Sequence, residues 1–191
     1  MNRKSRSGSQ QQLRIIGGKW RSRRIAFPDR DGLRPTGDRI RETLFNWLAP
    51  DIPAARCLDA FAGSGALGFE ALSRGAETVV FVEQDAAAYR HLLDTKALLD
   101  AEGATIIQQD LLTWLKAAQP SPFDIIFLDP PFAHGLYDPV FSALEESGAI
   151  AAGSLIYIEK ALAEEAAPPP NWRCLRDKRA GDVHFRLFIV D

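Results

Sequence analysis

The sequence predicts a doubly wound α/β fold, in which helices cover both faces of a mostly parallel sheet. Two segments, residues 79–82 and 125–128, are apolar at every position, as expected for strands that are buried on both faces. From residue 56 onward, strand-like segments alternate with helix-like patterns, which is typical of successive β-α-β units. A glycine-rich stretch, residues 63–68, follows the first of these strands and fits G-x-G-x-x-G, a spacing that favours a strand-to-helix turn beside a nucleotide-like ligand.

The length and composition fit one main domain with a small appendage. The chain has 191 residues, of which 46% are hydrophobic, enough for one well-buried core. No apolar stretch approaches the roughly 18 residues that cross a bilayer, and the polar, basic N-terminus lacks the apolar middle of a secretory signal. We therefore expect a cytoplasmic protein without a membrane partner. Cys57 and Cys174 have no Cys or His at metal-ligand spacing, so we expect reduced core thiols, no disulfide and no metal.

Charge is distributed unevenly along the chain. Residues 1–41 contain 12 Lys or Arg and three Asp, a balance of +9, so residues 42–191 carry −11 of the net charge of −2. A basic arm before an acidic body is typical of a protein whose N-terminal part meets a polyanion such as RNA. Residues 1–12 are better explained as a flexible basic tail, because a composition rich in Ser, Gln and Arg cannot bury a core.

The first structured segment is predicted to be a β-hairpin. Residues 13–27 contain two β-prone runs around Gly17-Gly18, a pair that suits a tight turn between antiparallel strands. Its basic side chains, with Trp20 among them, could bind phosphates and stack on a base. A hairpin that only covers an edge of the sheet explains the pattern equally well.

A helix is predicted to follow, ending near residue 48. Thr36 or Asp38 can cap its N-terminus, and Pro50 follows its end. Its first turn places Arg39 and Arg41 beside free backbone N–H groups, where an anionic group could bind, although arginines at a helix start are also common surface residues. Residues 13–55 are thus predicted to form an N-terminal extension, and residues 56–191 the main domain.

The main domain is predicted to alternate strands and helices. We expect strands at residues 56–60, 78–83, 104–109, 123–128 and 154–159, and helices at residues 66–74, 86–100, 111–118 and 139–147. After three prolines at 168–170, two strand-like runs at residues 172–178 and 183–190 flank a short turn, which predicts an antiparallel hairpin at the edge of the sheet. The predicted sheet therefore has seven strands, of which the last is antiparallel.

Acidic residues follow the first four predicted strands: Asp59, Glu83, Asp110 and Asp129. Ligands of open α/β sheets bind beyond the carboxyl ends of the strands, so these side chains are predicted to share one crevice. Four carboxylates are poorly suited to a pyrophosphate but suit a ligand that carries hydroxyls and a cation. Glu83 stands near the position where a carboxylate accepts hydrogen bonds from ribose hydroxyls.

The fourth strand ends in Leu128-Asp129-Pro130-Pro131-Phe132. Prolines lack N–H donors and fix φ, so this stretch must leave the sheet as a rigid loop with carbonyls free to accept hydrogen bonds. A carboxylate and a carbonyl beside an aromatic ring can hold a planar amine: Asp129 and the Pro130 carbonyl accept its two hydrogens, and Phe132 stacks on the base. A proline-rich strand exit with a core phenylalanine is the alternative interpretation.

These motifs resemble a known family. Asp-Pro-Pro-Phe at residues 129–132, after the loop at residues 59–68, is similar to the fourth-strand motif of S-adenosylmethionine-dependent amino-methyltransferases. Together with residues 34–48 (RPTGDRIRETLFNWL), these stretches resemble the RsmD family, bacterial methyltransferases that modify a guanine N2 in small-subunit ribosomal RNA. The resemblance extends from about residue 13 to the C-terminus and implies a Rossmann-like class I methyltransferase sheet.

The resemblance implies S-adenosylmethionine as cofactor, bound at the carboxyl ends of the first three strands. Asp59, Gly63 and Gly65 would line its methionine part, and Glu83 would hold its ribose. Two further residues, Asp110 and Leu111, would lie by the adenine. The complete implied cofactor set is Asp59, Phe61, Gly63, Ser64, Gly65, Glu83, Gln84, Asp110 and Leu111.

The resemblance also implies how the target is held. The implied catalytic residues are Asp129, Pro130, Pro131 and Phe132. Hydrogen bonds from the amine to Asp129 and Pro130 would push electron density onto the attacking nitrogen, and the base must be unpaired or flipped to reach them. The partner would be small-subunit ribosomal RNA, free or in the assembled small subunit, and the protein a monomer. The basic residues implied to contact RNA are Lys19, Arg21, Arg23, Arg24, Arg34, Arg39 and Arg41.

Other functions are compatible with parts of the sequence. Adenine N6 of DNA or RNA, or a protein glutamine, could receive the methyl group, because Asp-Pro-Pro-Phe does not separate these amines. A dinucleotide-dependent oxidoreductase would use the same glycine loop, but it leaves residues 129–132 unexplained and places Asp59 against a pyrophosphate. A non-catalytic RNA-binding protein on the same scaffold would neither bind S-adenosylmethionine nor transfer its methyl group.

Overall fold

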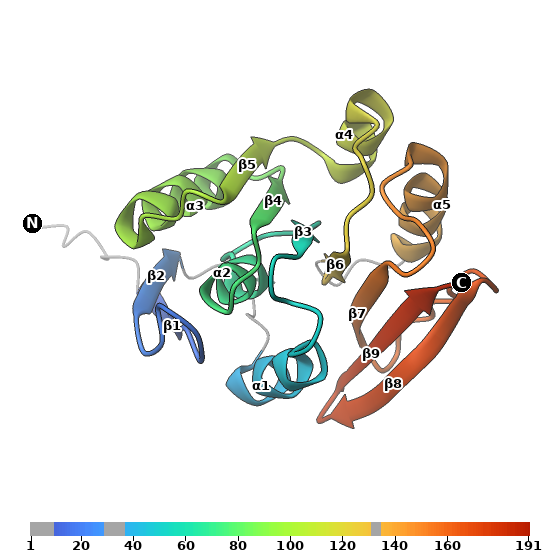
Figure 1. Ribbon diagram of the computed structural model, residues 1–191, viewed down its shortest axis with the longest axis horizontal. Helices are drawn as coiled ribbons and strands as arrows, with labels where there is room; N and C mark the ends of the chain where they lie inside the picture. Colours follow the sequence, from blue (N-terminus) through green and yellow to red (C-terminus); the bar gives the residue numbers. More distant parts are fainter. Residues whose placement is uncertain (1–9, 29–36, 131–134) are drawn as a thin grey trace, which may run out of the picture.

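A seven-stranded sheet forms the centre of the molecule (Figure 1), and its strand order is β5-β4-β3-β6-β7-β9-β8. The computed structural model describes residues 10–28, 37–130 and 135–191. The strands are β3 (Arg56–Asp59), β4 (Thr78–Glu83), β5 (Ala104–Gln108), β6 (Ile125–Leu128), β7 (Leu155–Ala161), β8 (Trp172–Ala180) and β9 (Val183–Val190). Strands β3 to β7 pair in parallel, whereas β9 is antiparallel to β7 and β8. The predicted fold class is confirmed.

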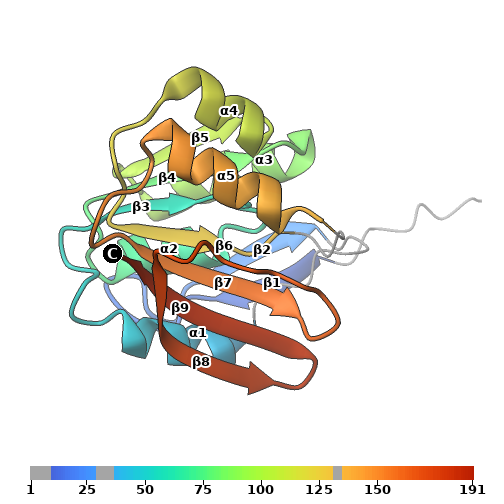
Figure 2. The ribbon, with the colours of Figure 1, turned by 90° about the vertical axis from the view of Figure 1, so that its right-hand side faces the viewer.

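Helices cover both faces of the sheet (Figures 1 and 2). Helices α1 (Asp38–Trp47), α2 (Ala66–Ser73) and α3 (Ala86–Leu99) contribute to one core cluster, and α4 (Leu111–Ala118) and α5 (Tyr137–Ser147) to the other. In β6, Ile125 and Phe127 point into the first cluster, and Ile126 and Leu128 into the second. An apolar run without alternation is therefore explained by burial on both faces. Among the described residues, no helix is long and apolar enough to span a bilayer.

The N-terminal hairpin exists, but its turn differs from the prediction. Strands β1 (Gln10–Arg14) and β2 (Arg24–Pro28) pair antiparallel, and residues 15–23 connect them, so Gly17-Gly18 is not the tight turn. The glycines instead approach α2: Gly18 has φ +76°, and a Cβ there would lie 1.8 Å from the Ser73 carbonyl oxygen. Trp20 is 7% exposed and belongs to the core, which favours a covering role over base stacking.

The prediction that Arg41 contacts RNA is wrong. Its side chain is fully buried, so it cannot meet a phosphate on the surface. Its guanidinium instead donates to the Asp38 carboxylate (2.5 Å) and to the Arg14 carbonyl (2.9 Å), and lies 3.6 Å from Glu70. Asp38 therefore contributes an ion pair and not the predicted cap; the N-cap is Gly37 without a side-chain hydrogen bond, and Thr36 lies outside the described residues.

Glu70 joins the N-terminal extension to α2. Its buried carboxylate accepts hydrogen bonds from the backbone N–H groups of Ile16 and Gly17, both at 2.8 Å, and from Arg74 Nε at 2.6 Å. Ser73 Oγ adds a bond from the Trp20 N–H and donates to the Gly17 carbonyl. The described residues of the N-terminal extension, 13–28 and 37–55, therefore share a core and a buried ionic network with the main domain.

The two cysteines differ in environment. Cys57 is buried in β3, and burial raises the pKa of its thiol far above the usual range. Cys174 is free as well but exposed on β8, so the expectation that both are core thiols is wrong for Cys174. The reason is that β8 is the last strand of the sheet.

Replacing Glu70 tests the buried network. Glu70→Ala is expected to lower the free energy of unfolding by about 3 kcal/mol, because it removes a carboxylate from two guanidinium groups inside the protein. Urea unfolding followed by circular dichroism measures this. Glu42→Ala, an exposed change on α1, should stay within about 0.5 kcal/mol of the parent protein. A loss below about 1 kcal/mol for Glu70→Ala would contradict the proposed importance of the network.

Candidate active site

Carboxylates hold both ends of the glycine loop between β3 and α2. Asp59, the last residue of β3, accepts a hydrogen bond from Gly68 N at 2.9 Å through Oδ2. Glu83, the last residue of β4, accepts one from Gly63 N at 2.8 Å through Oε2. Glu83 Oε1 also accepts from Asp85 N at 2.7 Å. The loop is therefore fixed to the carboxyl ends of two neighbouring parallel strands.

Two glycines of the motif are required by packing. Gly65, the N-cap of α2, has φ +77°, and a Cβ there would lie 2.5 Å from the Phe69 ring. At Gly68 a Cβ would lie 2.2 Å from the Phe81 ring. Phe81 is a buried residue of β4, so Gly68 allows α2 to approach the sheet closely, whereas Gly65 leaves room for the buried ring of Phe69 in the same helix.

The Asp59 carboxyl group lies in an apolar setting. It is 3% exposed, and burial raises its pKa to about 7, opposed by the Gly68 hydrogen bond and reinforced by the charge of Glu83. A carboxyl group that titrates near neutral pH ionises more readily when a cation lies beside it. The site therefore favours a positively charged ligand group near Asp59.

The predicted row of acids follows from the strand order. Asp110, Glu83, Asp59 and Asp129 follow or end the adjacent strands β5, β4, β3 and β6, so all four stand at one edge of the sheet. Asp110 is exposed and caps α4, accepting from Thr113 N at 2.9 Å. Among the described residues, no group of three His, Cys, Asp or Glu could hold a metal ion.

The other residues predicted to bind the cofactor line the same edge with different exposure. Ser64 and Leu111 are buried, and Phe61 and Gly63 are half-buried. Gln84 is exposed directly after β4. The loop and the strand ends that carry these residues determine their position. Their contact with a cofactor stays a prediction.

Asp129 stands beside a second acid, Glu159, that no sequence motif indicates. Leu128 of β6 pairs with Ile158 of β7, so the next residues, Asp129 and Glu159, occupy neighbouring positions. Tyr157 OH donates to Glu159 Oε2 at 2.7 Å. Burial, followed by the charges of Glu159 and then Asp129, raises the pKa of Tyr157 well above its usual range. The proximity of Asp129 and Glu159 follows from the register between β6 and β7, which are distant in sequence, and no local motif indicates it.

The predicted catalytic residues are only partly described. Asp129 is half-buried and Pro130 is buried, both directly after β6. Pro131 and Phe132 lie outside the described residues, as does Arg34 from the predicted RNA contacts. Strand β6 pairs directly with β3, so Asp129 follows the strand next to the glycine loop.

The basic loop of the extension lies at the opposite edge of the sheet. Lys19 N donates to the Ser73 carbonyl (2.7 Å) at the end of α2, and Arg23 Nη1 to the Leu98 carbonyl (3.3 Å) near the end of α3. Since α2 starts at the glycine loop and runs away from it, this loop is about 12 Å, one helix length, from the candidate site. The predicted RNA-contact residues that are exposed are Lys19, Arg21, Arg23, Arg24 and Arg39.

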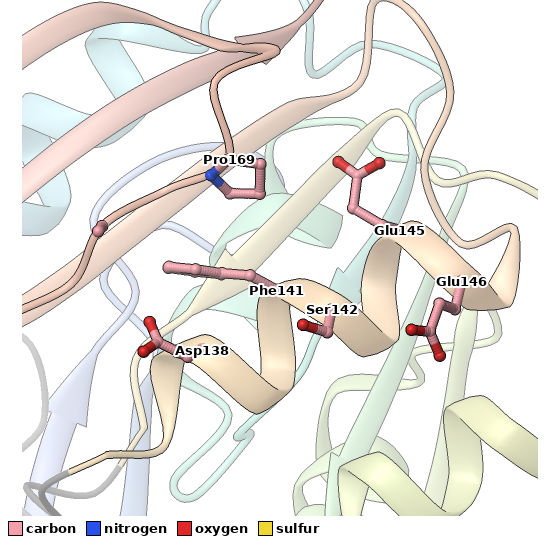
Figure 3. A pocket seen from close by; sticks show the side chains of 7 residues that line it. Asp138, Phe141, Ser142, Glu145, Glu146 and Pro169 are labelled. Atoms are coloured by element: carbon pink, nitrogen blue, oxygen red, sulfur yellow. The ribbon is translucent and has the colours of Figure 1, made fainter.

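A pocket of about 360 Å³ lies elsewhere, between α5 and the segment that precedes β8 (Figure 3). Glu145 on its wall accepts a hydrogen bond from Trp172 Nε1 at 2.6 Å and so anchors the start of β8. Three carboxylates make the pocket acidic, which does not suit RNA. None of the predicted site residues lines it; the lining is Asp138, Phe141, Ser142, Glu145, Glu146, Ala167 and Pro169.

The chain is similar to known proteins in sequence and in fold. The family model described as conserved hypothetical protein 95 matches residues 13–189. Ribosomal RNA small subunit methyltransferase D of Escherichia coli (strain K12) is 47% identical over 190 residues, covering 98% of this chain and 94% of the relative. The solved structure of yhhF from Escherichia coli is similar with a TM-score of 0.88 and 44% identity, covering 95% of this chain and 99% of that chain.

A more distant structure is similar in fold alone. It is the 16S rRNA N2 G1207 methyltransferase of Thermus thermophilus in complex with AdoMet and guanosine, with a TM-score of 0.69 and 20% identity. The match covers 96% of this chain and 50% of that chain. A methyltransferase whose structure contains both AdoMet and guanosine therefore has a fold similar to that of this chain.

Replacing Gly68 tests the packing of α2 on the sheet. Gly68→Ala is expected to cost about 1–3 kcal/mol of unfolding free energy, because its Cβ would overlap the buried Phe81 ring. Combining it with Phe81→Leu, which removes the overlapping ring atoms, should recover at least about 1 kcal/mol relative to the sum of the single changes. Thermal and urea unfolding measure both, and strictly additive effects would contradict the steric explanation.

Proposed function

The chain belongs to the RsmD family, and on that premise we propose that it transfers a methyl group from S-adenosylmethionine to the exocyclic N2 amine of a guanine in small-subunit ribosomal RNA. The observation that carries the proposal is the adjacency of two strand ends. Strand β3 leads into the carboxylate-held glycine loop, and its neighbour β6 leads into Asp129 and Pro130. The residues proposed to bind the methyl donor and those proposed to hold the amine thus follow neighbouring strands, which supports the proposal.

The residues at the β3 and β4 ends suit S-adenosylmethionine. Its sulfonium and ammonium charges match the buried Asp59 carboxyl group, which a nearby cation would ionise. Glu83 is oriented by two backbone N–H groups, and its remaining lone pairs can accept hydrogen bonds from ribose hydroxyls. When bound, S-adenosylmethionine supplies a sulfonium methyl group that is open to attack by an amine. Phe61, Ser64, Gly65, Gln84, Asp110 and Leu111 complete the proposed site.

Asp129 and Pro130 are proposed to hold the target amine. A guanine N2 is a weak nucleophile because its lone pair is delocalised into the ring. Hydrogen bonds from its two hydrogens to the Asp129 carboxylate and the Pro130 carbonyl orient the nitrogen and return electron density to it. Asp129 also offers an acceptor for the proton that must leave after transfer. The target base reaches these groups only when it is unpaired or flipped out.

The N-terminal extension, residues 13–55, is proposed to contact the RNA outside the site, and residues 56–191 to carry the reaction. Lys19, Arg21, Arg23, Arg24 and Arg39 are exposed and can neutralise phosphates. The buried network around Glu70 supports this role, because it holds residues 16–17 on the helix that begins at the glycine loop. We also propose that the protein acts as a monomer in the cytoplasm.

Methyl transfer tests the substrate class. Tritiated S-adenosylmethionine is incubated with the protein and with small subunits from a strain lacking the enzyme, naked small-subunit ribosomal RNA, genomic DNA or ribosomal protein. We expect label in the ribosomal RNA, from one or both RNA preparations. Label confined to DNA or protein would overturn the RNA assignment.

Replacing Asp129 separates binding from chemistry. Asp129→Ala is expected to lower kcat by about 10²–10⁴-fold, because it removes the acceptor for the amine hydrogen and proton. Calorimetric titration should give a Kd for S-adenosylmethionine within about threefold of the parent value, since the variant leaves the glycine loop intact. Asp138→Ala, an exposed acid at the start of α5, serves as control and should keep the parental rate. Parental turnover by Asp129→Ala would refute the proposed role.

The pH dependence of cofactor binding tests Asp59. Below pH 7 the buried carboxyl group is largely protonated in the free protein, so binding a cation beside it must release a proton. Affinity for S-adenosylmethionine is therefore expected to rise about tenfold between pH 5.5 and 7.5. Asp59→Asn should bind more weakly at pH 7.5 and show a flat profile. Calorimetry in buffers of different ionisation enthalpy measures the released proton, and an equal pH dependence in both proteins would disprove the coupling.

A further inference from the structure

Positive charge gathers on the hairpin formed by β8 and β9, on the other side of the molecule from the hairpin formed by β1 and β2 (Figure 1). Residues 172–190 contain five Lys or Arg and two Asp, within a body, residues 42–191, that carries −11. On β8, Arg173, Arg176, Lys178 and Arg179 are exposed. Arg173 pairs with Asp191 at 3.2 Å, whereas in the described parts of the chain no carboxylate lies within ion-pair distance of Arg176, Lys178 or Arg179.

The direction of β8 brings its last residues to the edge that carries Asp129. Both β7 and β8 are antiparallel to β9, so β8 runs parallel to β7 and β6. In Figure 2 the β7 and β8 arrowheads point to the same side of the molecule. Lys178 pairs with Phe185, which pairs with Glu159, the neighbour of Asp129. Three strand spacings, about 14 Å in all, thus separate Lys178 from Asp129.

The side chains at this end of β8 are positioned by their neighbours. Lys178 Nζ lies 5.8 Å from the Trp47 ring centre, and Trp47 stacks on Phe185 with centroids 5.4 Å apart. On the other face, Arg179 is in register with His184 and Lys160. Burial, then the charge of Arg186 and, less strongly, Arg179 lower the pKa of Lys160, opposed by Glu164. Lys160 is buried, so Arg179 is the exposed cation of this group, and an anion bound to Arg179 would offset its repulsion with Lys160.

The cations of the loop at residues 15–23 lie too far from Asp129 to bind RNA beside it. The Lys19 backbone and the Arg23 side chain bond to the ends of α2 and α3 at the opposite edge of the sheet. An RNA strand whose target base enters beside Asp129 therefore needs cations at the carboxyl edge. The end of β8 supplies them.

We propose that Arg176, Lys178 and Arg179 form a phosphate-binding surface that holds the RNA strand flanking the target base. The inference rests on the proposed function, since it takes ribosomal RNA as the partner. Lysines and arginines on an edge strand also prevent pairing with other sheets, which is the explanation that competes with RNA binding. The two explanations differ in what happens to RNA affinity when the charges are reversed.

A charge-matched pair of double variants tests the surface. Lys178→Glu with Arg179→Glu changes the carboxyl edge, and Arg173→Glu with Lys116→Glu makes the same change in charge at the start of β8 and in the last turn of α4. Filter binding to small-subunit ribosomal RNA is measured between 50 and 200 mM salt, and methyl transfer to small subunits is measured in parallel. We expect the first variant to bind at least tenfold more weakly, with a salt slope smaller by about 1 for each phosphate that it no longer neutralises.

Further readouts separate RNA binding from other roles. KM for small subunits should rise in the first variant, whereas kcat and the Kd for S-adenosylmethionine stay within about twofold of the parent. Lys178→Gln with Arg179→Gln, which keeps a polar edge strand without reversed charge, should show a smaller loss in the same direction. Parental RNA affinity and salt slope in this neutral variant, or equal losses in the charge-matched control, would overturn the proposal. If the parent protein binds RNA through this surface but methylates another nucleoside, the guanine assignment fails and the surface stands.

Discussion

Two hydrogen bonds from backbone amides to carboxylates, Gly68 to Asp59 and Gly63 to Glu83, determine the geometry of the site. They tie the glycine loop to the ends of β3 and β4 and thereby set the direction in which α2 leaves the sheet. Helix α2 in turn carries Glu70 and Ser73, which hold residues 16–20 of the extension. The glycine loop and a surface loop at opposite edges of the sheet are therefore connected through one short helix.

The order of strands brings the proposed methyl-donor site and the proposed amine site together. Because β6 pairs with β3, Asp129 and Pro130, which we propose to hold the amine, follow the strand next to the glycine loop. Beyond β6, strands β7, β9 and β8 extend the sheet, and the last residues of β8 place the exposed cations Lys178 and Arg179 at the same edge. The acids at the ends of the central strands suit a cationic cofactor and an amine. The cations at the end of β8 suit the phosphates of the RNA that carries the target base.

Strong local patterns predicted much of this structure. The sheet could be predicted from its continuously apolar strands and from the glycine spacing. The acid row could be predicted from the residues at the strand ends. Each of these patterns is formed by residues that are close together in the sequence. Arg41 was mistaken for a surface residue because a helical charge pattern does not reveal that Glu70, distant in sequence, lies opposite. Gly17-Gly18 resembled a turn but serves close packing on Ser73. The positions of Glu159 and of the β8 cations relative to Asp129 are set by strand register, which no local pattern reveals. The negative net charge of residues 42–191 also gave no sign of the cations on β8.

Methylation of a guanine amine is the reaction that we propose for this site. Small subunits from a strain lacking the enzyme are treated with the protein and S-adenosylmethionine, their RNA is digested to nucleosides, and the products are identified by mass spectrometry against synthetic standards. We expect N2-methylguanosine, gained only with active protein and absent with Asp129→Ala. Methyl groups found on adenosine N6, or an unchanged nucleoside profile under conditions in which the protein binds S-adenosylmethionine and the subunits, would contradict it.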